Sequence, residues 1–294
     1  MILIDWGTTR FRAYRVGADE RVLDTRVSAR GAGTIAQGGF RAVLDEQVGA
    51  WIEAGETRVL MCGMAGSRRG WQEVEYVGVP AGVGEIAAHA QRVDTPGIDA
   101  RIVPGLRCAD AMGVADVMRG EETEIVGCLD AHFARGMVCL PGTHTKWVRV
   151  EAGKIAEFAT FMTGDVYAAV KKDTILAQTM RADHEEPMTM SAFDDGVRRS
   201  QQAGGLTHHL FGIRTSVLTG RMDEGAASSY LSGLLIGHEV KESGAGDGPV
   251  HLAGDAALCS LYQAAIAIYG GAASVAPEGV ALRGLMRIGG MLQW

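Results

Sequence analysis

The chain has 294 residues and a net charge of −7, from 28 basic and 35 acidic side chains. An acidic chain with scattered basic residues lacks the positive surface that binds a nucleic-acid backbone, so no nucleic-acid partner is expected. Apolar residues make up 47% and charged residues 21%, a balance typical of folded globular chains. The length is about twice the commonest domain size and predicts two domains.

The cysteines and the first residues predict a cytoplasmic protein. Five cysteines are widely spaced and include no Cys-x-x-Cys pair, which favours reduced thiols over disulfides or a structural zinc site. Residues 1–5 lack the basic segment and the long apolar core of a signal peptide. The apolar stretches are interrupted before they reach membrane-spanning length, so no membrane partner is expected.

The first part of the chain begins with short strands. Residues 10–16 alternate between apolar and polar side chains, which indicates a half-exposed strand, and apolar residues at helical spacing predict a helix over 39–54. Strands followed by alternating helices and strands predict a mixed sheet flanked by helices. The predicted elements in order are strands at 2–4, 10–16 and 21–28, a helix at 39–54, and strands at 58–62 and 101–104.

The second part of the chain repeats this order. An apolar strand leads into a Pro-Gly-Thr-His-Thr turn, two more strands follow, and then helices and strands alternate. The predicted strands are 137–140, 146–150, 154–162, 250–253 and a short one near 273–275, and the predicted helices are 165–179, 191–203, 224–242, 256–269 and a last one from residue 277.

Residues 3–12 and 139–148 resemble each other closely. Each segment has an apolar strand, a Gly-Thr turn, and then a basic residue followed by an aromatic one. One such turn is a weak signal, but two copies that open two similar halves indicate an internal repeat. We therefore predict two lobes, at 1–115 and 116–294.

The two Gly-Thr turns are candidate phosphate-binding sites. Glycine turns present backbone N–H groups without a crowding Cβ, and threonine hydroxyls add further donors. Neither turn is a Walker loop, and no Rossmann glycine motif follows the first strand. The candidate residues are Gly7, Thr8 and Thr9 in the first turn and Gly142, Thr143, His144 and Thr145 in the second.

Charged residues flank both turns. Asp5 ends a buried strand, where its carboxylate could hold a hydrated Mg²⁺ beside the phosphates or accept hydrogen bonds from the turn. Lys146 could meet a phosphate or lie solvated on a strand face. The residues alone leave both alternatives open.

Two further glycine turns are candidate parts of the same site. Gly254 ends a strand and would let a flat adenine ring lie on the backbone, although Asp255 could equally be just the N-cap of the next helix. Glu121 follows Gly120 at a predicted helix start. There it could accept a proton from a substrate hydroxyl, or it could only complement the helix dipole.

Six segments carry a resemblance to known proteins: Ile-Asp-Trp-Gly-Thr-Thr (4–9), Met-Cys-Gly-Met-Ala-Gly-Ser (61–67), Met-Arg-Gly-Glu-Glu-Thr (118–123), Leu-Pro-Gly-Thr-His (140–144), Phe-Met-Thr-Gly-Asp (161–165) and Leu-Ser-Gly-Leu-Leu-Ile-Gly (231–237). In their order they resemble the actin-like sugar kinase superfamily, and in detail the 2-dehydro-3-deoxygalactonokinase family. The likeness runs from residue 2 to the final helix.

The resemblance implies an α/β fold of two ribonuclease-H-like (actin-like ATPase) lobes, with mixed sheets flanked by helices and a central nucleotide cleft. It implies ATP and Mg²⁺ as cofactors and a small sugar acid as partner. The implied reaction is phosphorylation of the 6-hydroxyl of 2-dehydro-3-deoxy-D-galactonate, which gives the 6-phosphate and ADP in galactonate and galactose catabolism.

The resemblance also implies residue roles. Glu121 is the expected base, although it is a methylene longer than the Asp of related kinases, and Asp165 is the competing candidate. Segment 63–71 is expected to contact the sugar through Gly63, Ser67 and Trp71. Arg68, Arg69 and Arg107 are either carboxylate partners or solvated surface residues. The residues expected at ATP and phosphate are Asp5, Gly7, Thr8, Thr9, Arg10, Gly142, Thr143, His144, Lys146 and Gly254, with Asp5 also at the metal.

Two alternatives remain beside this interpretation. One is another small-molecule kinase of the superfamily, such as a pantothenate or acetyl-sugar kinase. The other is an actin-like ATPase that acts as a regulator or filament subunit without transferring phosphate. The sequence also leaves open the C4 epimer of the sugar acid and the oligomeric state, for which a homodimer is one candidate.

Overall fold

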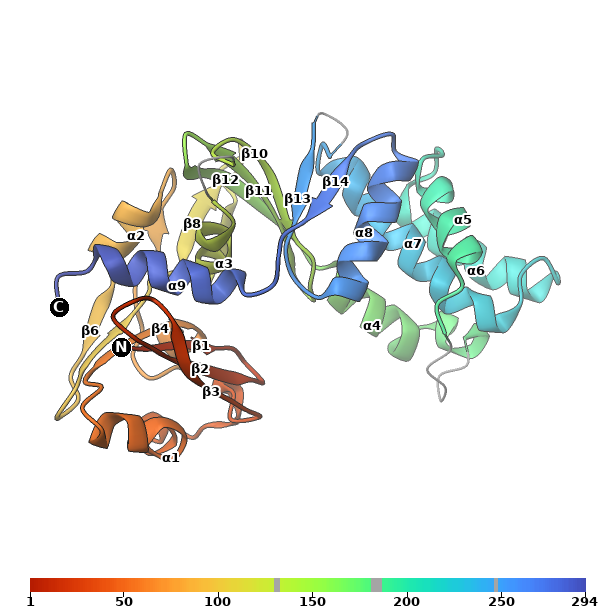
Figure 1. The fold of residues 1–294 in the computed structure, drawn as a ribbon. Coiled ribbons are helices and arrows are strands. Elements are labelled where there is room, and N and C mark those ends of the chain that lie inside the picture. The colour runs from red at the N-terminus through yellow and green to blue at the C-terminus, as the bar shows by residue number, and fades with distance from the viewer. Residues whose placement is uncertain (130–132, 181–186, 246–247) are drawn as a thin grey trace. The chain divides into compact units, whose positions relative to one another are not determined.

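The computed structural model of the chain describes residues 1–129, 133–180, 187–245 and 248–294 (Figure 1). It contains two compact units. The first comprises Met1–Arg135, Arg149–Phe158 and Pro277–Trp294, and the second comprises Gly136–Val148 and Ala159–Ala276. Packing thus assigns the C-terminal segment Pro277–Trp294 to the first unit. The predicted boundary near residue 115 rests on the sequence repeat, and it stays a prediction.

The main sheet of the first unit has six strands. Its first three strands form an antiparallel meander, and β1 then pairs in parallel with β4, which pairs in parallel with β7. This mixture confirms the predicted mixed sheet. The order is β3-β2-β1-β4-β7-β6, with β1 at Ile2–Trp6, β2 at Phe11–Val16, β3 at Val22–Ser28, β4 at Arg58–Gly63, β6 at Gln91–Val93 and β7 at Asp99–Ile102.

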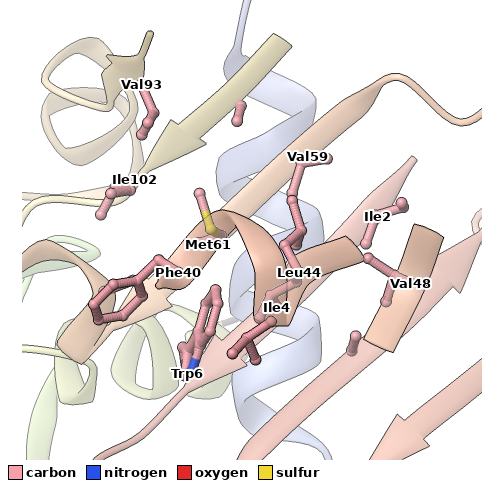
Figure 2. Packing of buried hydrophobic residues seen from close by; sticks show 14 of the residues in the cluster. Ile2, Ile4, Trp6, Phe40, Leu44, Val48, Val59, Met61, Val93 and Ile102 are labelled. Atoms are coloured by element: carbon pink, nitrogen blue, oxygen red, sulfur yellow. The ribbon is translucent and has the colours of Figure 1, made fainter. Parts of the chain in front are cut away.

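Helix α1 (Phe40–Glu53) supplies one side of the core of the first unit. Its buried residues Phe40, Leu44 and Val48 recur at helical spacing and pack on the strands, as Figure 2 shows. Trp6 lies among them, with its ring centroid 5.3 Å from that of Phe40. Because β1 is buried over most of its length, this core fixes the strand that leads into the first Gly-Thr turn.

Shorter elements complete the first unit. A second sheet in the order β5-β8-β9 contains Val77–Gly78, Leu106–Ala109 and Ala115–Met118. Three helices are α2 (Val83–Ala88), α3 (Glu121–Cys128) and α9 (Val280–Met291), and α9 packs along α3. Residues 149–158 join the unit through paired backbone hydrogen bonds between Ala81 and Ile155. The sequence patterns missed β5, β6, β8, β9 and α2, which are all too short to show a period.

A five-stranded sheet repeats the order of the first five strands of the six-stranded sheet. Its order is β12-β11-β10-β13-β14, with β10 at Gly136–Leu140, β11 at Thr145–Glu151, β12 at Lys154–Phe161, β13 at Val250–Leu252 and β14 at Ala273–Val275. Strands β10, β13 and β14 run parallel, as β1, β4 and β7 do. The first two strands of each sheet enclose a Gly-Thr turn at the same topological position. The predicted repeat and the ribonuclease-H-like fold class are thus confirmed.

Five longer helices belong to the second unit: α4 (Thr163–Asp173), α5 (Met190–Ser200), α6 (Gly205–Leu218), α7 (Glu224–Glu242) and α8 (Ala256–Ile268). The predicted helix over 165–179 ends early because Thr174 is extended and starts a separate 3₁₀ turn. Helix α6 was missed because it opens on two glycines with positive φ and carries several weak helix formers. Among the described residues, none of the helices combines the length and the apolar character needed to span a bilayer.

Helices α5 and α7 cross in backbone contact. A Cβ placed on Gly233 would lie 1.9 Å from the carbonyl oxygen of Phe193, and one placed on Gly196 would lie 2.2 Å from that of Tyr230. Real Cβ atoms do not approach carbonyl oxygens so closely, so both helices need glycine at the crossing. The crossing fixes α7, which lines the candidate site described below.

We expect Gly233→Ala to destabilise the protein by at least about 2 kcal/mol, because neither helix can move without disturbing a packed core. The measurement is the free energy of unfolding in urea. Gly212→Ala in α6 is the matched control: its Cβ would meet nothing within 4 Å, so the gain in helix propensity should stabilise by about 0.5–1 kcal/mol. A loss below about 0.5 kcal/mol in Gly233→Ala would contradict the close crossing.

Candidate active site

The first Gly-Thr turn links β1 to β2. The N–H of Gly7 donates to the carbonyl of Arg10 at 2.9 Å, and the carbonyls of Gly7 and Thr8 accept bonds from the backbone of residues 32–33, also at 2.9 Å. Backbone hydrogen bonds to residues 32–33 therefore fix the turn, while Thr8, Thr9 and Arg10 are exposed. A fixed turn with exposed hydroxyls and a guanidinium is suited to anion binding.

Asp5 precedes this turn, on β1. Its side chain is 21% exposed, and Arg12 Nη1 donates to its Oδ2 at 3.2 Å. Burial raises the pKa of Asp5, and the Arg12 guanidinium opposes that rise in part. The structure thus pairs Asp5 with a neighbouring side chain, which the sequence interpretation had not foreseen.

The loop after β4 and the start of α3 meet backbone to backbone. Gly63 has φ of 83° and Gly120 has φ of 108°, and a Cβ on Gly120 would lie 3.3 Å from the Cα of Gly63. Glu121 follows directly, and its Oε2 accepts a hydrogen bond from the backbone N–H of Arg119 at 2.9 Å. This bond fixes the carboxylate at the N-terminal end of α3.

Three glutamates share the first turn of α3. Burial, followed by repulsion from Glu121, raises the pKa of Glu122 to about 7, although Gly120 N–H and Thr123 Oγ1 both donate to it. Burial and then the charge of Asp5 raise the pKa of Glu124 to about 8. Asp5, Glu121, Glu122 and Glu124 therefore form one coupled acidic cluster. Among the described residues there is no set of three His, Cys, Asp or Glu side chains that could hold a metal ion alone.

The candidate sugar segment divides into buried and accessible residues. The Trp71 ring stacks near Phe40, with centroids 6.3 Å and planes 21° apart, and it also meets Trp6 edge-on, so it is part of the aromatic core. Ser67 is half-buried in a turn closed by Gly70. The candidate carboxylate partners Arg68, Arg69 and Arg107 are all exposed.

Arg119 is a residue that the sequence interpretation missed. Its guanidinium lies 4.3 Å from the Tyr76 ring centroid, and Nη2 donates to the carbonyl of Val74 at 2.6 Å. Its Nε and Nη1 are shielded from solvent and have no acceptor in the part of the chain that the structure describes. Arg119 thus ties segment 74–76 to the glycine turn before Glu121. No spacing in the sequence signals such a contact.

The second Gly-Thr turn gathers several predicted residues. His144 Nε2 and Asp165 Oδ2 are 2.9 Å apart, and the backbone N–H of Asp165 donates to the carbonyl of Thr143 at 3.2 Å. Lys146 is only 3% exposed and its Nζ donates to the carbonyl of His144 at 2.9 Å, so a solvated lysine is wrong. The start of α4 is therefore fastened to this turn.

The third glycine turn lies against the second. Gly254 has φ of 145°, and a Cβ there would lie 3.4 Å from the carbonyl oxygen of Pro141. Asp255 Oδ1 accepts from the N–H of Leu258 at 3.0 Å, so the N-cap interpretation of Asp255 is confirmed.

A cavity of about 370 Å³ opens beside the second turn. Its size falls within the usual range of small-molecule sites. Its lining is mainly apolar, apart from the turn and a few hydroxyls, which suits a flat heterocycle. The residues that line it are Gly142, Thr143, Thr163, Gly164, Tyr167, Met188, Ser232, Leu235, Ile236, Leu258, Leu261 and Tyr262.

The raised pKa of Glu122 predicts a pH-dependent stability. The folded pKa of Glu122, about 7, exceeds the unfolded value of about 4.3. Between about pH 4.3 and pH 7 the folded chain therefore binds more protons than the unfolded chain. The free energy of unfolding consequently falls as the pH rises through this range. We expect Glu122→Gln to gain on the order of 2 kcal/mol over the wild type between pH 5 and pH 8.

Urea unfolding at several pH values, without nucleotide, measures this difference. Glu53→Gln, at an exposed position of α1, is the control and should keep the wild-type pH dependence. Parallel curves for the wild type and Glu122→Gln would show that Glu122 stays ionised in the folded state.

Comparison with known proteins agrees with this geometry. Residues 5–288 match the model of the family described as 2-keto-3-deoxy-galactonokinase. A protein named as a 2-dehydro-3-deoxygalactonokinase in Rhizobium meliloti is 39% identical over 90% of this chain and 87% of its own length. The 2-dehydro-3-deoxygalactonokinase of Escherichia coli is 34% identical over 81% of this chain and 78% of its own.

A crystal structure gives the same result. A protein from Sinorhizobium meliloti, described as a 2-dehydro-3-deoxygalactonokinase protein, superposes with a TM-score of 0.89 at 36% identity, over 98% of this chain and 97% of its own. Residues 5–288, which match the family model, include both Gly-Thr turns, the acidic start of α3 and the cavity beside the second turn. The chain belongs to the 2-keto-3-deoxy-galactonokinase family.

Proposed function

We propose that the protein is an ATP-dependent kinase that phosphorylates the 6-hydroxyl of 2-dehydro-3-deoxy-D-galactonate. The products are the 6-phosphate and ADP, and the reaction belongs to galactonate catabolism. The names of the relatives support the reaction, and one structural observation carries it: two sheets of the same strand order each present a glycine-threonine turn after their first strand. The expected cytoplasmic location and the homodimer stay predictions.

We assign ATP to the glycine turns and the cavity. The cavity beside Gly142 and Thr143 accepts the adenine ring, with Gly254 on the neighbouring turn. The phosphates take donors from both Gly-Thr turns. Phosphoryl transfer depends mainly on positioning and charge neutralisation, so fixed donors are the contribution expected of such turns. The phosphate residues proposed are Gly7, Thr8, Thr9 and Arg10 in the first turn, and Gly142, Thr143, His144 and Lys146 in the second.

We assign Mg²⁺ to Asp5. Mg²⁺ in phosphotransferases is commonly held by one or two carboxylates together with phosphate oxygens and water, so a site without three protein ligands fits. Asp5 also lies in the field of Glu124, whose pKa it raises, so a cation beside it would relieve repulsion in the acidic cluster. When bound, Mg²⁺ neutralises the charge that builds up on the transferring phosphoryl group.

We assign proton acceptance from the 6-hydroxyl to Glu121. It is the first residue of α3, and the bond from Arg119 N–H holds its orientation. Asp165 is instead engaged with His144 and with the second turn, which suits a role in orienting His144 towards phosphate. Gly63 and Ser67 are proposed at the sugar acid. Trp71 is also proposed there, although its ring packs against the aromatic core.

We expect Glu121→Gln to lower kcat by roughly 10²- to 10⁴-fold with little change in either KM, because general-base assistance is worth about that much. Asp165→Asn should mainly raise the KM for ATP, because it removes the partner of His144. A coupled ADP-release assay on both variants, after thermal melts show that they fold, makes the comparison. The roles are reversed if Asp165→Asn loses the larger share of kcat.

We expect Asp5→Asn to fold normally, since the amide can stay beside Arg12, but to lose most turnover and to need more Mg²⁺ for half-maximal rate. The measurement is the initial rate over a Mg²⁺ titration at saturating ATP and sugar acid. Asp45→Asn, which breaks an exposed ion pair with Arg41 in the same unit, is the control and should behave as wild type. A kcat near that of the wild type in Asp5→Asn would rule out the proposed role.

A further inference from the structure

Glu239 is a buried acid that the proposed mechanism does not use. It lies in the last turn of α7 and is 3% exposed. Its Oε1 accepts from Trp147 Nε1 at 2.7 Å, and its Oε2 accepts from the Tyr262 hydroxyl at 2.9 Å. The Thr163 side chain is a further hydrogen-bond partner. One carboxylate on α7 therefore joins β11, α8 and the start of α4.

The hydrogen bonds continue from Glu239 to the second phosphate turn. The Tyr262 hydroxyl donates its single hydrogen to Glu239 Oε2. The Tyr262 oxygen then accepts from Thr145 Oγ1, 2.9 Å away. With its own hydrogen used there, Thr145 Oγ1 presents a lone pair to the N–H of Gly142 at 3.4 Å. Hydrogen bonds thus connect Glu239 through Tyr262 and Thr145 to the backbone of Gly142.

Three of these residues line the cavity assigned to adenine. Tyr262, Thr163 and Gly142 all line it. The Trp147 ring centroid lies 6.4 Å from that of Tyr262. A buried carboxylate costs several kcal/mol of desolvation, and an apolar residue of similar volume would fill this space at lower cost. The presence of an acid therefore indicates that orientation of its donors matters here.

We propose that Glu239 is a positioning residue for the nucleotide: through Tyr262 and Thr145 it orients the second phosphate turn, and through Trp147 and Thr163 it holds the wall of the adenine cavity. It does not itself touch ATP. The inference rests on the proposed function, because it takes the turn and the cavity as the ATP site. It adds a residue that lies outside every sequence motif considered above.

The test compares Glu239→Gln and Tyr262→Phe with a control. Each should raise the KM for ATP roughly tenfold or more, as expected for a lost hydrogen bond to a charged group, and leave the KM for the sugar acid within about twofold. The double variant should add little beyond the larger single effect, because both substitutions break one chain. Glu242→Gln, at an exposed position on the same helix, should leave both KM values unchanged.

Calorimetric titration with ADP gives a readout that does not depend on turnover. The two variants should bind ADP about tenfold more weakly than the wild type or more. If Glu239→Gln does not fold, Tyr262→Phe decides, since it removes only a hydroxyl. An unchanged KM for ATP in Tyr262→Phe, or equal increases in both KM values, overturns the inference. A wild type that neither binds ADP nor turns over sugar acid overturns the proposed function instead, so the two failures are distinguishable.

Discussion

Backbone-to-backbone contact between turns is the constraint on which the candidate site depends. In the first unit, a Cβ on Gly63 would lie 2.7 Å from the carbonyl oxygen of Trp6, at the end of β1, and Gly120 in turn lies on Gly63. In the second unit, Gly164 lies on Thr143, where a Cβ would come within 2.6 Å of its Cα. Because glycine has no side chain, these contacts bring the backbones of distant segments close together, and with them the neighbouring functional residues.

Buried carboxylates are the second common feature of the two units, and they are stabilised differently. Burial raises the pKa of Glu239, but three donors from different elements oppose that rise in part and fix tertiary structure. The two donors of Glu122 both come from its own helix start, and a like charge stands beside it. Desolvation therefore prevails at Glu122 and its pKa moves towards neutrality. The hydrogen bonds of Glu239 connect separate elements of the fold. At Glu122 the repulsion between neighbouring carboxylates remains, and a bound cation would reduce it.

The sequence predicted most of the fold because its signals are local. The repeated segments at 3–12 and 139–148 gave the two sheets, and helix α7 was predicted with its observed bounds because its apolar spacing and its Asp223 N-cap agree. Helix α6 was missed since glycines and weak helix formers hide a helix that tertiary packing on α7 stabilises. The turns of the candidate site were found through glycine and threonine, which have a local conformational meaning.

The contacts behind those turns could not be predicted in the same way. Trp71 was expected at the sugar because of its place in a motif, yet its ring packs with Phe40, 31 positions earlier in the chain. Arg119 and Glu239 bind partners that are remote in sequence, and no periodicity or spacing encodes such pairs. The sequence thus predicted the glycine turns of the candidate site. The side chains that hold these turns in place could be identified only from the structure.

The packing of α9 has a consequence for how the chain is made. A Cβ on Gly284 would lie 1.8 Å from the carbonyl oxygen of Thr123, and Arg283 and Arg287 donate to carbonyls at the end of α3. Helix α3, which carries Glu121, therefore packs against residues that are synthesised more than 150 positions later. Most of the second unit, in contrast, lies in the continuous stretch Gly136–Ala276. During synthesis the internal stretch can fold before α9 has been made, so α3 and the proposed base at its start gain their last packing partner only after residues 280–291 have been added.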